Sequence, residues 1–136
     1  MEKSLILTAS AGAGKTYNLV QYYLSEILSG KRPFYSILAV TFTNAAGNEM
    51  KERVLETLFK LSFSEKEYSY IIQLQEFDGL RTISEDEIRR RAKRTLHAIL
   101  HDYSRFSVST LDSFFQTLIR SFAKEYNLQL DRKSVV

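Results

Sequence analysis

The feature that most constrains this chain is a run of small residues at positions 9–16, which reads Ala-Ser-Ala-Gly-Ala-Gly-Lys-Thr. It follows a short apolar run typical of a buried strand, and it leads into apolar residues at helical spacing. Small residues allow a loop to curve closely around phosphate oxygens with its backbone N–H groups pointing inward. A nucleotide-binding phosphate loop has the pattern Gly, any four residues, Gly-Lys-Ser/Thr, and here Ala9 replaces the first glycine. We therefore expect this segment to hold the phosphates of a nucleoside triphosphate.

Two side chains of this loop are expected to take part in the chemistry. Lys15 can reach the β and γ phosphates as a point charge, and the Thr16 hydroxyl can ligate Mg²⁺. A helix that begins near Lys15 adds the positive end of its dipole to the same anion site. The predicted nucleotide contacts are Ala9, Ser10, Ala11, Gly12, Ala13, Gly14, Lys15 and Thr16, with Lys15 and Thr16 also catalytic.

Strands and helices alternate along the rest of the sequence. Strand-like runs occupy residues 4–8, 36–42 and 106–110, and helical periodicity covers about 15–29, 44–61, 84–100 and 111–126. Asn44 is expected to cap the second of these helices, and Ser84 with Glu87 forms a capping box for the third. The alternation predicts an α/β unit with a mainly parallel sheet and an irregular or helical insertion after residue 62.

Each predicted helix has an apolar stripe that is expected to face the core. The four stripes are Leu19, Val20, Tyr23, Leu24, Ile27 and Leu28; Met50, Val54, Leu58 and Leu61; Ile88, Ala92, Leu96, Ile99 and Leu100; and Phe114, Phe115, Leu118, Ile119, Phe122 and Tyr126.

Composition excludes several classes of site. With 136 residues and 44% hydrophobic content, the chain can form one globular unit with one core. Cysteine is absent, which excludes disulfides, thiolate metal sites and cysteine nucleophiles. No apolar run is long enough for a signal peptide or a membrane span, so we expect a cytoplasmic protein with no membrane partner. The net charge of +3 is compatible with an anionic partner but does not indicate nucleic acid by itself.

Two further segments carry a resemblance to a known family. Residues 41–54 read Thr-Phe-Thr-Asn-Ala-Ala-Gly-Asn-Glu-Met-Lys-Glu-Arg-Val, and residues 109–115 read Ser-Thr-Leu-Asp-Ser-Phe-Phe. With these segments the chain resembles the superfamily 1 DNA helicases of the UvrD/Rep group, in which they match motifs Ia and Ib. The second segment and the form of the phosphate loop resemble the branch that includes AddA and RecB.

The resemblance implies an ATP-dependent DNA helicase or helicase–nuclease that translocates on single-stranded DNA in replication or repair. It implies ATP and Mg²⁺ as cofactors, single-stranded DNA or a duplex end as partner, and a nuclease or helicase partner subunit. It also implies a P-loop RecA-like unit of three layers, divided into residues 1–62 (phosphate loop and motif Ia), 63–103 (helical insertion or start of an inserted subdomain) and 104–136 (motif Ib). The DNA contacts that it implies are Thr41, Phe42, Asn44, Thr110, Ser113 and Phe114.

The chain departs from the family pattern in three respects. Position 45 is Ala where the family has Lys, and no glutamine-bearing adenine segment precedes the phosphate loop. The Asp-Glu pair that would hold Mg²⁺ and align the attacking water follows no strand in this sequence. We therefore interpret the chain as the amino-terminal piece of a larger, truncated motor and expect these residues alone to bind nucleotide with negligible unwinding.

Other interpretations remain open at this stage. The chain is compatible with a small P-loop kinase that uses residues 106–112 as its metal-binding strand, or with a non-catalytic nucleotide- or DNA-binding remnant. For Phe42 and Phe114 a place in the core is as well supported as DNA contact. His97 and His101 have the spacing of two zinc ligands but lack a third, which favours a solvated or packed pair. The basic residues in 89–94 follow three acids, which favours a solvated helix face over a DNA-backbone contact.

Overall fold

The computed structural model describes residues 5–8, 13–63 and 68–134, with side chains described at 17–63 and 69–127. Its strands are β1 (Leu5–Thr8), β2 (Ile37–Thr41) and β3 (Val108–Thr110). Its helices are α1 (Ala13–Leu28), α2 (Asn44–Phe63), α3 (Tyr68–Leu74), α4 (Glu85–His101) and α5 (Leu111–Ser134), and short 3-10 turns lie at Phe34–Ser36, Asp78–Leu80 and Tyr103–Arg105. The predicted alternation of strands and helices is confirmed.

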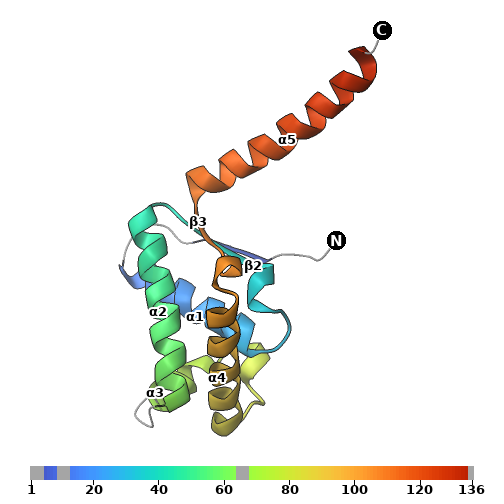
Figure 1. Ribbon diagram of the computed structural model, residues 1–136. Coiled ribbons are helices and arrows are strands. Elements are labelled where there is room, and N and C mark those ends of the chain that lie inside the picture. The colour runs from blue at the N-terminus through green and yellow to red at the C-terminus, as the bar shows by residue number, and fades with distance from the viewer. Residues whose placement is uncertain (1–4, 9–12, 64–67, 135–136) are drawn as a thin grey trace.

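The sheet has three parallel strands in the order β1-β2-β3. Thr8 lies opposite Val40, and Thr41 lies opposite Thr110. Because all strands run the same way, their carboxyl ends meet at one edge, which we call the strand-end edge. Helices α1, α2 and α5 follow the three strands in sequence, so they begin at this edge (Figure 1).

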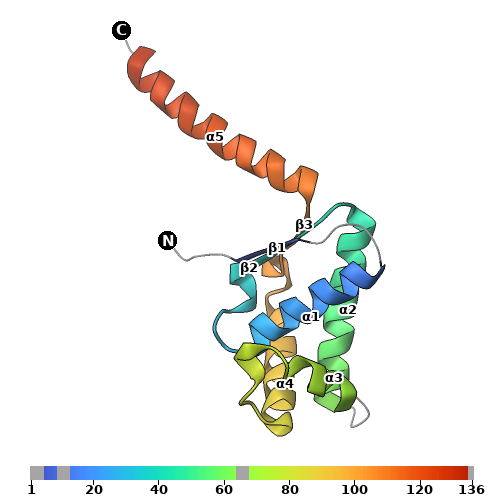
Figure 2. The same cartoon turned by 180° about the vertical axis from the view of Figure 1, so that it is seen from behind.

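Helices α1, α2 and α4 lie together on one side of the sheet, whereas α5 leads away from the other side (Figures 1 and 2). The predicted stripes of α1 and α2 are all buried. The insertion contributes to the same core through Ile71, Leu74, Leu80, Ile88, Ala92 and Ile99. The segment 63–103 therefore packs as part of the body, and its division from the flanking segments remains a prediction.

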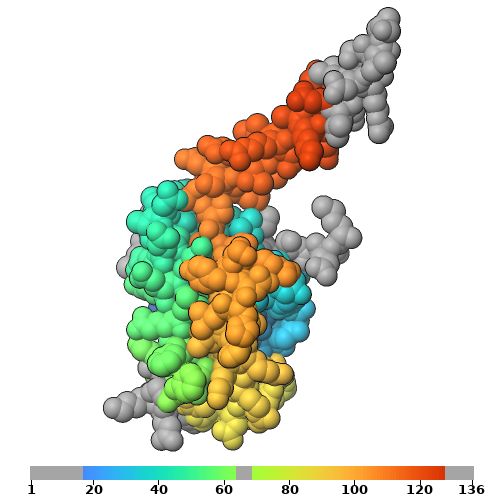
Figure 3. Space-filling model, in the orientation of Figure 1, coloured from blue at the N-terminus to red at the C-terminus, as the bar shows by residue number. Residues whose placement is uncertain are grey.

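The predicted burial of the last helix is wrong. Phe115, Leu118, Ile119, Phe122 and Tyr126 are all exposed on α5. The helix leaves the sheet at its first turn and extends from the body, so no described element packs against this stripe (Figure 3). Leu100 is also exposed, because it lies at the margin of the α4 face defined by the buried Ile88, Ala92 and Ile99.

The ends of the helices follow local capping chemistry, with one correction. Asn44 does not cap α2; the hydroxyl oxygen of Thr43 accepts the backbone N–H of Ala46 at 3.0 Å, and Asn44 is the first helical residue. Ser84 caps α4 as predicted, accepting the Glu87 N–H at 3.2 Å. Gly30 ends α1 with a φ of +78°, a conformation that glycine adopts at least cost.

The described helices also differ from membrane spans in length and hydropathy. None among the described residues is both long and apolar enough to cross a bilayer.

Candidate functional site

The phosphate loop joins β1 to α1 at the strand-end edge. Residues 9–12 lie outside the described part of the chain, as do the side chains of Lys15 and Thr16. The backbone from Ala13 onward forms the first turn of α1, and Lys15 and Thr16 lie in that turn. The first N–H groups of a helix have no intrahelical partner and carry the positive end of the dipole. The local backbone therefore fits a phosphate group beside Ala13 and Gly14.

The second segment of the edge begins with Thr41, the last residue of β2, which is buried. Its hydroxyl donates to the carbonyl oxygens of Thr43 at 3.1 Å and Ser109 at 3.4 Å. These bonds join the turn before α2 to the neighbouring strand β3. Thr41 therefore positions the edge, and its hydroxyl is occupied within the chain.

Gly47 is a packing residue that sequence reasoning missed. A Cβ atom at this position would lie 3.1 Å from the Thr41 hydroxyl and 3.4 Å from a methyl of Val108. The absence of a side chain thus allows the first turn of α2 to approach β2 and β3. Its place one turn after the strand was the available signal, because close helix–strand packing commonly requires glycine there.

Phe42 and Asn44 follow Thr41 on the outside of the edge. The Phe42 side chain is 54% exposed, so it is not a core residue and the core interpretation is wrong for it. Asn44 is exposed and is not engaged as a cap. An exposed ring and a carboxamide after a buried strand can stack on a base and bond to a phosphate or a base edge.

The third segment lies beside the second through the Thr41–Thr110 pair. The Thr110 hydroxyl oxygen accepts the backbone N–H of Ser113 at 3.2 Å and donates to the Ser113 hydroxyl at 2.9 Å. Thr110 thus caps α5, Ser113 is exposed, and Phe114 is half-buried. The fold therefore brings five of the predicted DNA contacts to one edge around the well-ordered pair Thr41–Thr110, together with Phe114 in the first turn of α5.

The histidine pair lies elsewhere, on the exposed side of α4. The rings of His97 and His101 are edge to face, with centroids 4.4 Å apart. Within the described residues, no three His, Asp or Glu side chains are grouped as metal ligands. The packed-pair interpretation of these histidines is supported.

The basic residues of α4 divide into two sets. Arg89 donates to the carbonyl oxygen of Leu61 at 2.9 Å, and Arg91 donates to that of Leu28 at 2.9 Å. These two arginines therefore tie α4 to the last turns of α2 and α1, and the solvated-face interpretation is wrong for them. Arg90 and Arg94 are exposed, as that interpretation predicted.

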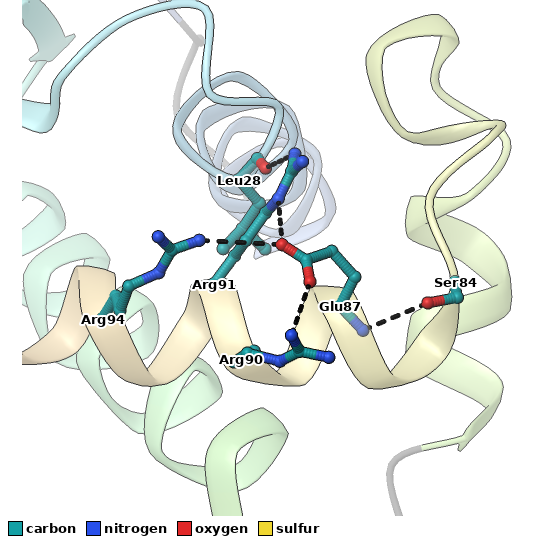
Figure 4. Close-up of polar contacts among 6 residues, drawn as sticks. All are labelled: Leu28, Ser84, Glu87, Arg90, Arg91 and Arg94. Carbon is teal, nitrogen blue, oxygen red and sulfur yellow. Dashed lines mark hydrogen bonds and ion pairs between the residues drawn. The ribbon is translucent and has the colours of Figure 1, made fainter.

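Glu87 links both sets (Figure 4). Its carboxylate lies 3.1 Å from Arg91, 3.4 Å from Arg90 and 3.6 Å from Arg94. The hydrogen bond from Arg91, with the charges of the neighbouring arginines, lowers the pKa of Glu87 below its ordinary value. In the core, burial raises the pKa of Tyr23 far above its ordinary value.

Comparisons with known proteins agree with the motifs at this edge. The family described as "UvrD/REP helicase N-terminal domain" matches residues 1–135. A protein of Lactobacillus johnsonii, named as the AddA-type subunit of an ATP-dependent helicase/nuclease, is 35% identical over 130 residues, which is 95% of this chain and 8% of that protein. Proteins of the same name are 36% identical over 129 residues in Lactobacillus gasseri (95% of this chain, 8% of the relative) and 46% identical over 59 residues in Acetivibrio thermocellus (42% and 5%). The chain thus spans about a twelfth of the length of the two Lactobacillus relatives, and no solved structure matches it.

Proposed function

The chain belongs to the UvrD/REP helicase N-terminal domain family, and we propose that it forms the ATP-binding part of a DNA helicase or helicase–nuclease. The observation that carries this proposal is the meeting of three segments at one edge of the sheet. The phosphate loop precedes α1, residues 41–44 precede α2, and residues 110–113 open α5. The relatives are named as helicase/nuclease subunits, and their activity as whole proteins is part of what we propose for this chain.

We assign the nucleotide to residues 9–16. In this arrangement the backbone N–H groups of the loop and of the first turn of α1 hold the phosphate oxygens. Lys15 neutralises charge on the β and γ phosphates, and Thr16 supplies a hydroxyl ligand for Mg²⁺. When bound, the metal ion neutralises the phosphates. The unit is then a P-loop RecA-like fold, of which the three parallel strands are the described part.

We assign single-stranded DNA to the outside of the same edge. Phe42 offers an exposed ring for stacking, and Asn44 and Ser113 offer exposed polar groups. Thr41 and Thr110 act through the backbone, since their hydroxyls hold the turn before α2 and the start of α5. Because the nucleotide and DNA segments end neighbouring strands, a shift at one has a short, rigid path to the other.

For the isolated chain we propose nucleotide binding without appreciable turnover. The sequence offers no Asp-Glu pair after a strand, and Asp112 lies in the first turn of α5 instead of at the end of β3. A group that aligns the attacking water is required for hydrolysis. ATPase assays of the 136 residues with and without DNA test this assignment, and substantial DNA-stimulated turnover contradicts it.

The nucleotide site is tested by Lys15→Ala. We expect the affinity for a fluorescent ATP analogue with Mg²⁺ to fall about tenfold or more, because a charge-assisted contact to phosphate is lost. The measurement is an equilibrium titration of the purified chain. Lys124→Ala removes an exposed lysine of α5 and is the matched control, with unchanged affinity expected. Equal affinity of the Lys15→Ala variant and the wild type would place the nucleotide elsewhere.

The DNA edge is tested by Phe42→Ala. A base stacked on this ring is worth about 1–3 kcal/mol, so binding of a labelled single-stranded oligonucleotide is expected to weaken by at least fivefold. Phe59→Ala is the control, since Phe59 lies on α2 and is 57% exposed against 54% for Phe42. A loss of the same size in both variants, or in neither, contradicts the assignment. The affinity for the ATP analogue is expected to stay unchanged in both.

A further inference from the structure

A second basic surface lies away from the strand-end edge. The segment 30–36 connects α1 to β2, and a cavity of about 680 Å³ lies between this segment and α4. We call it the α4 groove; its walls include Arg32, Tyr35, Arg91 and Arg94. Since residues 30–36 precede β2, the groove lies near the amino end of that strand, opposite to the edge where the strands end.

The groove has a strong positive character. Three arginines line it, and none of its described lining residues is acidic. The nearest carboxylate in the network is that of Glu87, which is shared among three guanidinium groups and therefore neutralises at most one of them. Arg91 is fixed by its bond to Leu28, whereas Arg94 has a side chain that is 71% exposed. The groove thus combines one rigid cation with others that can reach a ligand.

The positive surface continues along α4 beyond the groove. Arg90, Arg94, His97 and His101 are all exposed and follow one another at intervals of four, three and four residues. This spacing places them on one face of a helix, over a length of about 16 Å at a rise of 1.5 Å per residue. A single phosphate group cannot occupy such a length, but consecutive phosphates of a nucleic-acid strand can.

The rim of the groove also carries an aromatic ring. Tyr35 is exposed, and the guanidinium group of Arg105 lies 3.7 Å from its ring centroid. The stacked pair presents a cation and a flat surface together. Rings beside a row of cations are typical of surfaces that bind single strands, because unpaired bases can stack on them.

We propose that the α4 groove and the adjoining face of α4 bind the phosphate backbone of single-stranded DNA, as a second contact remote from the strand-end edge. The proposal rests on the proposed function only in taking DNA as the partner. Arg94 and Arg90 contact phosphates, Arg91 orders the wall, and Tyr35 accepts a base at the rim. A strand held at both places would be bound on two sides of the body.

The test uses the full 136-residue chain and a labelled single-stranded oligonucleotide, titrated by fluorescence anisotropy at several salt concentrations. Arg94→Gln is expected to weaken binding about fivefold and to reduce the slope of log K against log salt by about 0.7, the value for one phosphate contact on a single strand. Arg81→Gln is the matched control, because its side chain is 67% exposed and pairs with an acid, Asp78, as Arg94 pairs with Glu87. We expect Arg81→Gln to keep the wild-type affinity and slope, and Tyr35→Leu to lower the affinity with little change in slope.

Several outcomes overturn the proposal. An unchanged affinity and slope for Arg94→Gln overturns it, as does an equal loss for Arg81→Gln, which would indicate net charge alone. If Arg94→Gln weakens binding of inorganic phosphate or ATP but not of the oligonucleotide, the groove is a small-anion site. If blunt duplex DNA is bound as well as the single strand and loses as much affinity, the single-strand assignment is wrong.

Failure of the groove and failure of the proposed function are distinguishable. Phe42→Ala reports on the strand-end edge and Lys15→Ala on the nucleotide, and neither residue lines the groove. A wild-type chain that binds no oligonucleotide at low salt overturns the groove proposal, yet the Lys15→Ala result on nucleotide binding still stands. Thermal unfolding of Arg94→Gln, expected to match the wild type, shows that any loss is not caused by misfolding.

Discussion

Helices α2 and α5 both carry an apolar stripe at helical spacing, but only the stripe of α2 is buried. Met50, Val54, Leu58 and Leu61 have no exposed surface, and they face α4 and the sheet. On α5 the corresponding residues, Phe115, Leu118, Ile119, Phe122 and Tyr126, are exposed along a helix that leads away from the body. A period of 3.6 residues determines which face of a helix is apolar, but it does not determine which element covers that face.

The two helices therefore contribute differently to stability. Burial of apolar surface is the main favourable term in folding, and it is available to α2 but not to most of α5. The exposed stripe is larger than the isolated apolar residues that are normal on protein surfaces. The described body is accordingly expected to hold its fold through α1, α2, α4 and the sheet, with α5 attached by its first turn.

The sharpest test of this comparison is the same truncation in both helices. Leu58→Ala removes a side chain with 0% exposure, and we expect a loss of about 2–5 kcal/mol in the free energy of unfolding from lost burial and the cavity that remains. Leu118→Ala truncates a side chain that is 38% exposed, and a change within about 0.5 kcal/mol is expected. Urea unfolding followed by circular dichroism measures both.

The comparison breaks if the two variants lose similar free energy. That result would mean that the stripe of α5 is covered in solution. Sedimentation of the wild type then separates a second copy from an intramolecular contact, since only self-association makes the unfolding midpoint depend on protein concentration.

A smaller effect is expected from the link between α4 and α1. Arg91→Ala removes the donor to the Leu28 carbonyl and leaves the last turn of α1 without that partner, so we expect a loss of about 1–3 kcal/mol. Arg90→Ala is the matched control on the same helix; its ion pair with Glu87 is exposed and worth at most about 1 kcal/mol. Thermal unfolding of the two variants side by side decides whether the attachment of α4 depends on Arg91 itself or on the net charge of the helix.

Much of this fold follows from local patterns in the sequence. The strands were predicted from uninterrupted apolar runs, and the faces of α1 and α2 from their spacing, because both signals depend on neighbouring residues. The wrong expectations concern contacts between distant parts of the chain. The exposure of α5 and the inward turn of Arg89 and Arg91 depend on where other helices end, which residue spacing does not encode.

The candidate site divides in the same way. The motifs place residues 9–16, 41–44 and 110–113 at strand ends, and the parallel sheet brings the described parts of these segments to one edge. Spacing could not show that Thr43 caps α2 in place of Asn44, or that the Thr41 hydroxyl bonds to β3. Both depend on the path of the turn. The consequence is that Asn44 and Phe42 are left exposed for a ligand.

The smallest expected effect concerns pH and the Glu87 network of the body. Because the pKa of Glu87 is lowered in the folded chain, its ionised form stabilises the fold, and this stabilisation is complete above the ordinary value of 4.5. As pH falls below that value toward the lowered pKa, the carboxylate is protonated and the contribution is lost. We expect the melting temperature of Glu87→Gln to fall less between pH 6 and pH 3 than that of the wild type, measured by circular dichroism. Glu125→Gln on the exposed α5 is the control and should keep the wild-type profile. A wild-type profile for Glu87→Gln would mean that the arginines of α4 are held by their carbonyl acceptors alone, and that the body and α5 do not differ in this respect.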